Sequence, residues 1–146
     1  MSEESKAIAR RLVEEVWNKG NLAVADEILA ANVRDWDAAR INYPASPGSE
    51  LGSEGFKQLV TLFRAAFPDV YLTIEDMIAE GDKVVVRWIA HGTHSGELRG
   101  IGPTGKQITV TGIDIHRIVH GKIVEGWGNW DTMGMMQQLG VIPQIW

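Results

Sequence analysis

The chain has 146 residues, a net charge of −5 and no cysteine. This is the length of one domain, and the missing cysteine excludes disulfides and thiolate chemistry. The acidic charge without a basic run argues against nucleic acid as a partner. No stretch is long and apolar enough to cross a membrane, and the charged N-terminus lacks a signal-peptide core, so we expect a cytoplasmic protein with no membrane partner.

The first third of the chain reads as two helices and a loop. Apolar residues at helical spacing predict a helix over residues 2–19 and a shorter one over 22–30. From 31 to 52 the periodicity is lost, and Pro, Gly and Ser predict an ordered loop. Trp36 lies in this loop, which indicates that the loop packs against the rest of the protein.

A third helix is followed by a run of strands. Residues 53–67 carry the clearest helical stripe of apolar side chains, and Pro68 ends it. Period-two patterns and turn residues predict strands over 70–80, 83–94, 107–119 and 122–131, then a short helix over 132–139. Helices followed by an antiparallel meander predict one α+β domain over residues 1–146. We expect a curved, cone-shaped antiparallel sheet with the N-terminal helices packed on its inner face.

The last two strands carry an unusual set of polar side chains. His120-Gly121 fits a two-residue turn between them, which would place His116 opposite Glu125 and Asp114 opposite Trp127. Residues that alternate along paired strands share a face. In this register one face collects Asp114, His116, Glu125, Asn129 and Asp131 around Trp127.

This polar face has two interpretations. It is either a solvated sheet surface or the lining of a cavity, and the need to cover Trp127 favours the cavity. A one-residue bulge would exchange the two faces. A carboxylate in an apolar cavity keeps its proton more readily, so it can move protons next to a carbonyl while a His or Asn stabilises the enolate oxygen.

Three further positions have alternative roles. Asp131 stands where the last helix begins, so it could cap that helix, act as an acid/base, or do both. Arg87 lies in a β-branched run and either pairs with an inward carboxylate or faces solvent; His91 shares its face.

Metal and cofactor signals are missing from the sequence. The four histidines, His91, His94, His116 and His120, have no metal-binding spacing. No glycine-rich phosphate loop and no nucleophile arrangement is present, so we expect neither a metal nor a cofactor.

Several motifs together resemble a known family. They are FPD at residues 67–69, GTHSG at 92–96, PTGK at 103–106, GKIVE at 121–125 and WDTMGMMQQLG at 130–140. The chain resembles the SnoaL-like polyketide cyclases, or ester cyclases, of the nuclear transport factor 2-like superfamily, most strongly over residues 54–140.

The resemblance implies a cone-shaped α+β barrel with an internal pocket, commonly dimeric or tetrameric. Characterised members close a ring of a polyketide ester by intramolecular aldol condensation, without cofactor or metal. Their acid/base Asp before the last helix matches Asp131, and an assisting His on the preceding strand matches His116. The polar residue two positions before that His matches Asp114, and Asn42 lies where relatives often carry a His.

Three functions remain open. The first is acid/base catalysis of the cyclase, isomerase or aldol type on a small hydrophobic carbonyl compound, with Asp131 and His116 as catalytic residues. The second is an epoxide hydrolase-like activation of water by Asp114, Asp131 and Arg87. The third is binding of a small hydrophobic molecule without catalysis. The expected substrate-binding residues are Asp114, Trp127, Asn129, Arg87, His91, Asn42 and Trp36.

Overall fold

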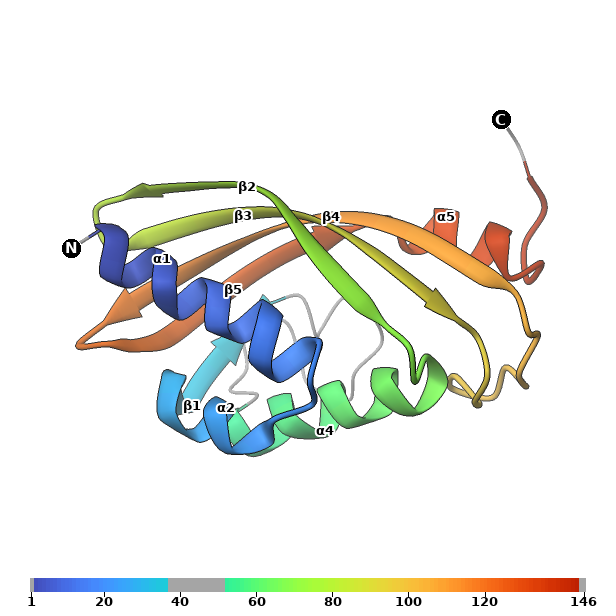
Figure 1. The fold of residues 1–146 in the computed structure, drawn as a ribbon, viewed down its shortest axis with the longest axis horizontal. Coiled ribbons are helices and arrows are strands. Elements are labelled where there is room, and N and C mark those ends of the chain that lie inside the picture. Colours follow the sequence, from blue (N-terminus) through green and yellow to red (C-terminus); the bar gives the residue numbers. More distant parts are fainter. Residues whose placement is uncertain (1, 37–51, 145–146) are drawn as a thin grey trace.

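A five-stranded sheet with helices on its concave side forms the core of the computed structural model, which describes residues 2–36 and 52–144. The helices are α1 (Ser2–Arg11), the π-helical η1 (Leu12–Trp17), α2 (Leu22–Ile28), α4 (Gly52–Ala66) and α5 (Thr132–Gln138). The strands are β1 (Leu29–Asp35), β2 (Tyr71–Glu80), β3 (Lys83–Thr93), β4 (Gln107–Val119) and β5 (Lys122–Trp130). The sheet order is β1-β5-β4-β3-β2. In Figure 1 the sheet arches over α1, α2 and α4, and α5 lies at one end.

The predicted α+β class and the placement of the helices are confirmed, with one correction to the sheet. It is mixed rather than wholly antiparallel, because β1 runs parallel to β5. The sequence pattern predicts a loop from residue 31 onward, whereas the structure has strand β1 over Leu29–Asp35. This edge strand buries only Leu29 and Val33, and its register shifts between Leu29 and Arg34, so no period-two pattern is visible in the sequence.

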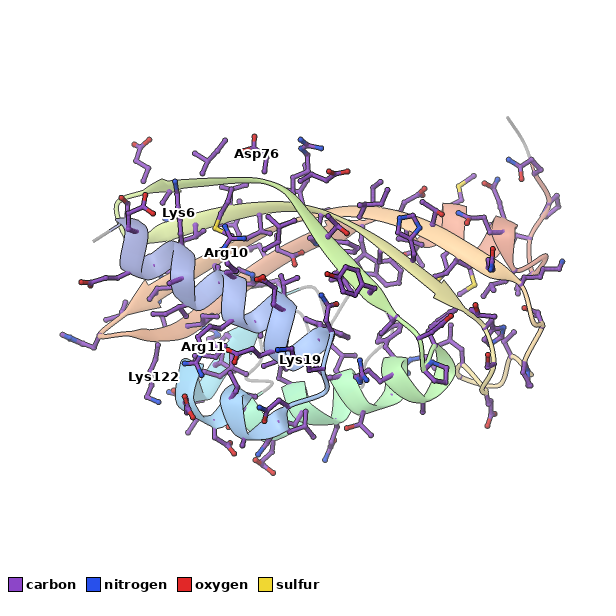
Figure 2. All side chains as sticks on the ribbon, in the orientation of Figure 1. Lys6, Arg10, Arg11, Lys19, Asp76 and Lys122 are labelled. Carbon is purple, nitrogen blue, oxygen red and sulfur yellow. The ribbon has the colours of Figure 1, made fainter. Side chains whose placement is uncertain are left out.

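The predicted first helix is confirmed, but its second half changes type. α1 places acidic side chains in its first turn and basic ones in its last, which suits the helix dipole. η1 then widens, and the Asn18 N–H bonds to the carbonyl of Val13. Basic side chains are spaced along this helical segment and just beyond its end: Lys6, Arg10, Arg11 and Lys19 (Figure 2).

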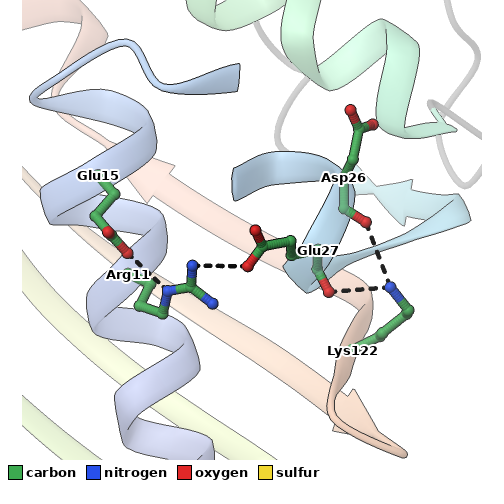
Figure 3. Close-up of polar contacts among 5 residues, drawn as sticks. All are labelled: Arg11, Glu15, Asp26, Glu27 and Lys122. Carbon is green, nitrogen blue, oxygen red and sulfur yellow. Dashed lines mark hydrogen bonds and ion pairs between the residues drawn. The ribbon is translucent and has the colours of Figure 1, made fainter. Parts of the chain in front are cut away.

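Polar contacts connect α1, α2 and the β4–β5 turn (Figure 3). Arg11 contacts Glu15 at 2.7 Å within the N-terminal helical segment and Glu27 of α2 at 2.8 Å. Lys122, the first residue of β5, donates to the carbonyl oxygens of Asp26 and Glu27 at 3.3 and 2.9 Å. The amine thereby satisfies carbonyls in the last turn of α2.

The β4–β5 hairpin contains the bulge that decides which side chains face inward. The His120-Gly121 turn is confirmed, with φ of 51° and 75° and Val119 opposite Lys122. Ile118 then pairs with Ile123, but Arg117 pairs with Glu125, so Val124 has no partner in the register. A β-bulge of this kind shifts every later pair by one residue.

The predicted pairings beyond the bulge are therefore wrong. His116 lies opposite Gly126 and Asp114 lies opposite Gly128. Glu125, one residue closer to the turn, lies opposite Arg117 instead of His116.

The last helix closes one end of the sheet. Met135 and Leu139 are buried. The side chain of Gln138 accepts a hydrogen bond from the N–H of Thr109 at 2.7 Å and donates one to its carbonyl at 2.9 Å. α5 is thus attached to β4 beyond the point where β5 ends.

Candidate active site

An apolar cavity of about 120 Å³ lies between the inner face of the sheet and the helices. Aromatic side chains form much of its wall, contributed by η1, α4, the residue after α4, β3 and the end of β5. They are Trp17, Phe63, Phe67, Trp88 and Trp130. The ionisable side chains that the described residues contribute to this wall are Asp114 and His116, both from β4. Interpreting these two side chains as part of a cavity lining was therefore right.

A second cavity of about 50 Å³ adjoins the first, and Asp114 and His116 border both. Its wall includes Gly126 and Gly128, which lie opposite His116 and Asp114. Because these β5 positions carry no side chain, space remains beside the carboxylate and the imidazole. A methyl group on Gly126 would lie 3.5 Å from Nδ1 of His116.

A side chain of the neighbouring strand β3 holds the Asp114 carboxylate in place. Its Oδ2 accepts a hydrogen bond from Nε1 of Trp88 at 3.1 Å. Trp88 is 8% exposed, so this bond forms in a largely dry wall of the cavity. A hydrogen bond of this type fixes the direction of the carboxylate.

The imidazole of His116 is neutral at pH 7. Its side chain is buried, and burial lowers the pKa from 6.5 to about 4. A neutral imidazole carries one N–H donor and one acceptor nitrogen. It can therefore donate a hydrogen bond to a substrate oxygen without carrying a positive charge into the apolar cavity.

None of the remaining members of the predicted polar face borders the large cavity. Trp127, which also borders the smaller cavity, pairs with Ile115, and Asn129 pairs with Ile113, the residues that alternate with the inward side chains of β4. Asp131 is exposed and caps α5, accepting a hydrogen bond from the Gly134 N–H at 2.9 Å. Its predicted capping role is confirmed, and it lies outside the wall of the large cavity.

Glu125 of β5 contacts Arg117 of β4 and Trp36, the residue after β1, instead of facing His116. Its carboxylate contacts Nε of Arg117 at 3.3 Å and accepts a hydrogen bond from Nε1 of Trp36 at 2.9 Å. The guanidinium carbon of Arg34 lies 5.6 Å from the centre of the Trp36 ring. Trp36 therefore packs against the sheet, while the rest of the expected loop, residues 37–51, lies outside the described residues.

Arg87 and His91 lie on the outer face of β3. Arg87 is exposed, so it faces solvent rather than an inward carboxylate. Nδ1 of His91 lies 3.2 Å from the Thr109 hydroxyl, also on the outside. Asn42 is outside the described residues. Because Asp114 faces inward while Arg87 and Asp131 do not, the three residues of the expected water-activating arrangement do not meet.

Trp88 and the two glycines beside Asp114 and His116 were not among the predicted site residues. Glycine at alternate positions 126 and 128 of a strand was the available signal, since it often marks a close approach or a space for a ligand. Within residues 2–36 and 52–144, no cluster of three or more metal-ligating side chains is found. No helix in those ranges is both long and apolar enough for a membrane span.

A curved sheet over helices, with one carboxylate and one neutral imidazole in an apolar cavity, defines a protein with a pocket for a small molecule. The model of the SnoaL-like polyketide cyclase family matches residues 7–139. The chain belongs to this family.

Individual relatives agree with this assignment. Nogalonic acid methyl ester cyclase of Streptomyces nogalater is 34% identical over 94 residues, which are 64% of this chain and 70% of that protein. The structure of IdmH from Streptomyces antibioticus, a candidate polyketide cyclase, has a TM-score of 0.81 and 31% identity, covering 93% of this chain and 98% of IdmH. AclR from Streptomyces galilaeus, a candidate hydroxylase, has a TM-score of 0.83 and 26% identity over 99% of this chain and 86% of AclR. Family membership and the cyclase relatives support a cyclase function.

Proposed function

We propose that the protein closes a ring in a small hydrophobic carbonyl compound by an intramolecular aldol reaction, using acid–base chemistry without cofactor or metal. The observation that carries the proposal is the placement of Asp114 and His116 together in the wall of an otherwise apolar cavity. Such a cavity binds an apolar substrate and keeps bulk water away from a reactive enolate.

The reaction needs one group that removes a proton and later returns it. The Asp114 carboxylate takes a proton from the carbon next to one carbonyl, and that carbon then bonds to a second carbonyl carbon of the same molecule. The carboxylic acid formed on Asp114 protonates the new alkoxide, which restores the carboxylate. The N–H of His116 stabilises the enolate oxygen by a hydrogen bond.

The general acid/base assigned from the family resemblance, Asp131, stays a prediction. Two matched variants separate the candidates. Asp114→Asn keeps the size and the hydrogen-bond acceptor but cannot move the proton, so we expect turnover to fall by about 100-fold or more. Asp131→Asn keeps a capping side chain, and we expect near wild-type turnover with little loss of stability.

Ring closure is measured by chromatography and mass spectrometry on polyketide-type keto esters. The first to test is nogalonic acid methyl ester, the compound in the name of the Streptomyces nogalater relative. Thermal unfolding of both variants is the control for folding. Wild-type turnover by folded Asp114→Asn would rule out the role of Asp114, and loss of turnover in Asp131→Asn alone would return that role to Asp131. Undiminished activity after dialysis against EDTA is expected for a reaction without metal.

The third function, binding without catalysis, is the alternative favoured by the apolar cavity itself. Trp17, Trp88 and Trp130 line the cavity, so their fluorescence reports occupancy. Saturable quenching by a keto ester that is recovered unchanged would support binding alone.

We further propose that the outer face of the sheet joins two copies of the chain. Tyr71 and Ile78 of β2 are each 59% exposed, and Ile113 of β4 is 48% exposed. Light scattering of the purified protein should give a dimer or tetramer mass, and Ile113→Lys should lower it. A monomeric wild type would refute the association.

A further inference from the structure

Gly112 lies where a side chain would block the approach of Trp88 to Asp114. It stands two residues before Asp114 on the same face of β4, and it pairs with Trp88 across the β3–β4 ladder. A Cβ atom at Gly112 would overlap Cζ2 of Trp88 and lie 2.6 Å from Cε2. The indole therefore occupies the space that a side chain at position 112 would need.

This position of the indole lets a residue of β3 reach a carboxylate of β4. Nε1 of Trp88 donates to Oδ2 of Asp114 at 3.1 Å, from a side chain that also forms part of the cavity wall. An alanine at position 112 would force the indole to move, since the added methyl group would overlap the ring itself rather than a flexible chain end.

We propose that Gly112 and Trp88 act as a positioning pair that sets the direction and the proton affinity of the Asp114 carboxylate. The inference rests on the proposed function, in which Asp114 moves the proton. The indole N–H bonds better to the ionised carboxylate than to the acid, so it stabilises the charged form. It also restricts rotation of the carboxylate, which keeps the base aimed at the substrate.

Within residues 2–36 and 52–144, the ionisable groups that share a cavity with Asp114 are left unchanged by the substitution at Trp88. His116 shares both cavities with Asp114, and Arg34 and Asp35 at the end of β1 share the smaller one. η1 and α4 contribute Leu12 and Leu59 to both walls, which cannot titrate. Replacing Trp88 therefore removes the indole N–H while these groups remain.

The test is the pH profile of kcat/KM for Trp88→Phe, which keeps an aromatic ring and loses the N–H. We expect the acidic limb to move up by about one pH unit, and kcat to fall by about 10-fold with a smaller change in KM. Trp130→Phe is the matched control, because it alters another indole of the same wall. Its KM should change while its acidic limb stays in place.

Gly112→Ala should reproduce the shifted limb of Trp88→Phe, and if Gly112→Ala does not fold, Trp88→Phe alone decides. An unshifted limb in Trp88→Phe, with Asp114→Asn inactive, would overturn the positioning pair and leave the proposed function standing.

A second readout needs no turnover. The indole N–H proton resonance of Trp88 should shift as the carboxylate titrates, and this titration should vanish in Asp114→Asn. A resonance that does not respond to pH in the wild type would also overturn the inference. Active Asp114→Asn would instead refute the proposed function, and the resonance would still report whether the hydrogen bond exists.

Discussion

His116 and Gly126 lie opposite each other across the β4–β5 ladder, so β5 places no side chain beside the buried imidazole at this position. Burial lowers the pKa of His116 to about 4, whereas an unfolded histidine titrates near 6.5. The unfolded chain therefore binds a proton between these values and the folded chain does not, so stability is complete above pH 6.5 and falls as the pH drops toward 4.

The His116→Gln variant removes this titration. Between pH 7 and 4.5 we expect the wild type to lose about 2 kcal/mol more unfolding free energy than the variant. Urea unfolding of both proteins at the two pH values measures the difference. Equal losses would show that His116 is not neutralised by burial.

The FPD motif ends in a carboxylate that connects the start of β2 to the end of β3. Asp69 accepts hydrogen bonds from the N–H and the hydroxyl of Thr93, both at 2.7 Å, and these bonds lower the pKa of Asp69. Asp69→Asn should cost about 1 kcal/mol at pH 7. The difference in stability should shrink as the pH falls from 3.8 through the lowered pKa of the folded carboxylate, because the unfolded chain takes up its proton first. Thr93→Val, which keeps the N–H, should lose less; a deficit that is independent of pH would contradict the role of the charge.

The GTHSG motif requires its last glycine for a close backbone contact. The N–H groups of Ser95 and Gly96 both bond to the carbonyl of Ala66, and a Cβ atom on Gly96 would overlap the carbonyl oxygen of Ala65. Gly96→Ala should lower the unfolding free energy by about 2–3 kcal/mol, since backbone must move. Gly102→Ala is the control, because a methyl group there would meet no described atom within 4 Å. Similar stability of the two variants in urea would refute this account.

Lys122 provides a smaller, electrostatic contribution. Its amine bonds to carbonyls in the last turn of α2, where a positive charge also suits the helix dipole. Lys122→Met should cost about 0.5 kcal/mol, and less in high salt. Lys83→Met, another exposed lysine at the start of a strand, is the control. Equal effects of both variants at low salt would show that the contact with α2 contributes nothing.

Strong local signals predicted most of the fold correctly. The apolar stripe of α4 and the His120-Gly121 turn are each determined by residues close together in the sequence, and the structure confirms both. β1 was missed because its pairing with β5 comes from distant residues. The bulge at Val124 was also hidden, because Ile123 and Val124 are both β-branched and either could face inward.

The candidate site was predicted only in part, because the bulge in β5 was not predicted. Asp114 and His116 precede the bulge and lie on β4, so their shared face follows from strand alternation alone. Trp127 and Asn129 follow the bulge, and their face was assigned wrongly. The hydrogen bond from Trp88 crosses between strands and depends on Gly112, which local patterns do not reveal.

The attachment of α5 to β4 has a consequence for how the protein behaves among other chains. Where β5 stops, the backbone of Thr109 would present an open donor and acceptor to any passing strand. The amide of Gln138 takes the place of a peptide group and occupies both. Gln138 thereby prevents a further strand from pairing with β4 at this point. Gln138→Ala should expose the Thr109 backbone and allow a β-strand of another molecule to pair with it.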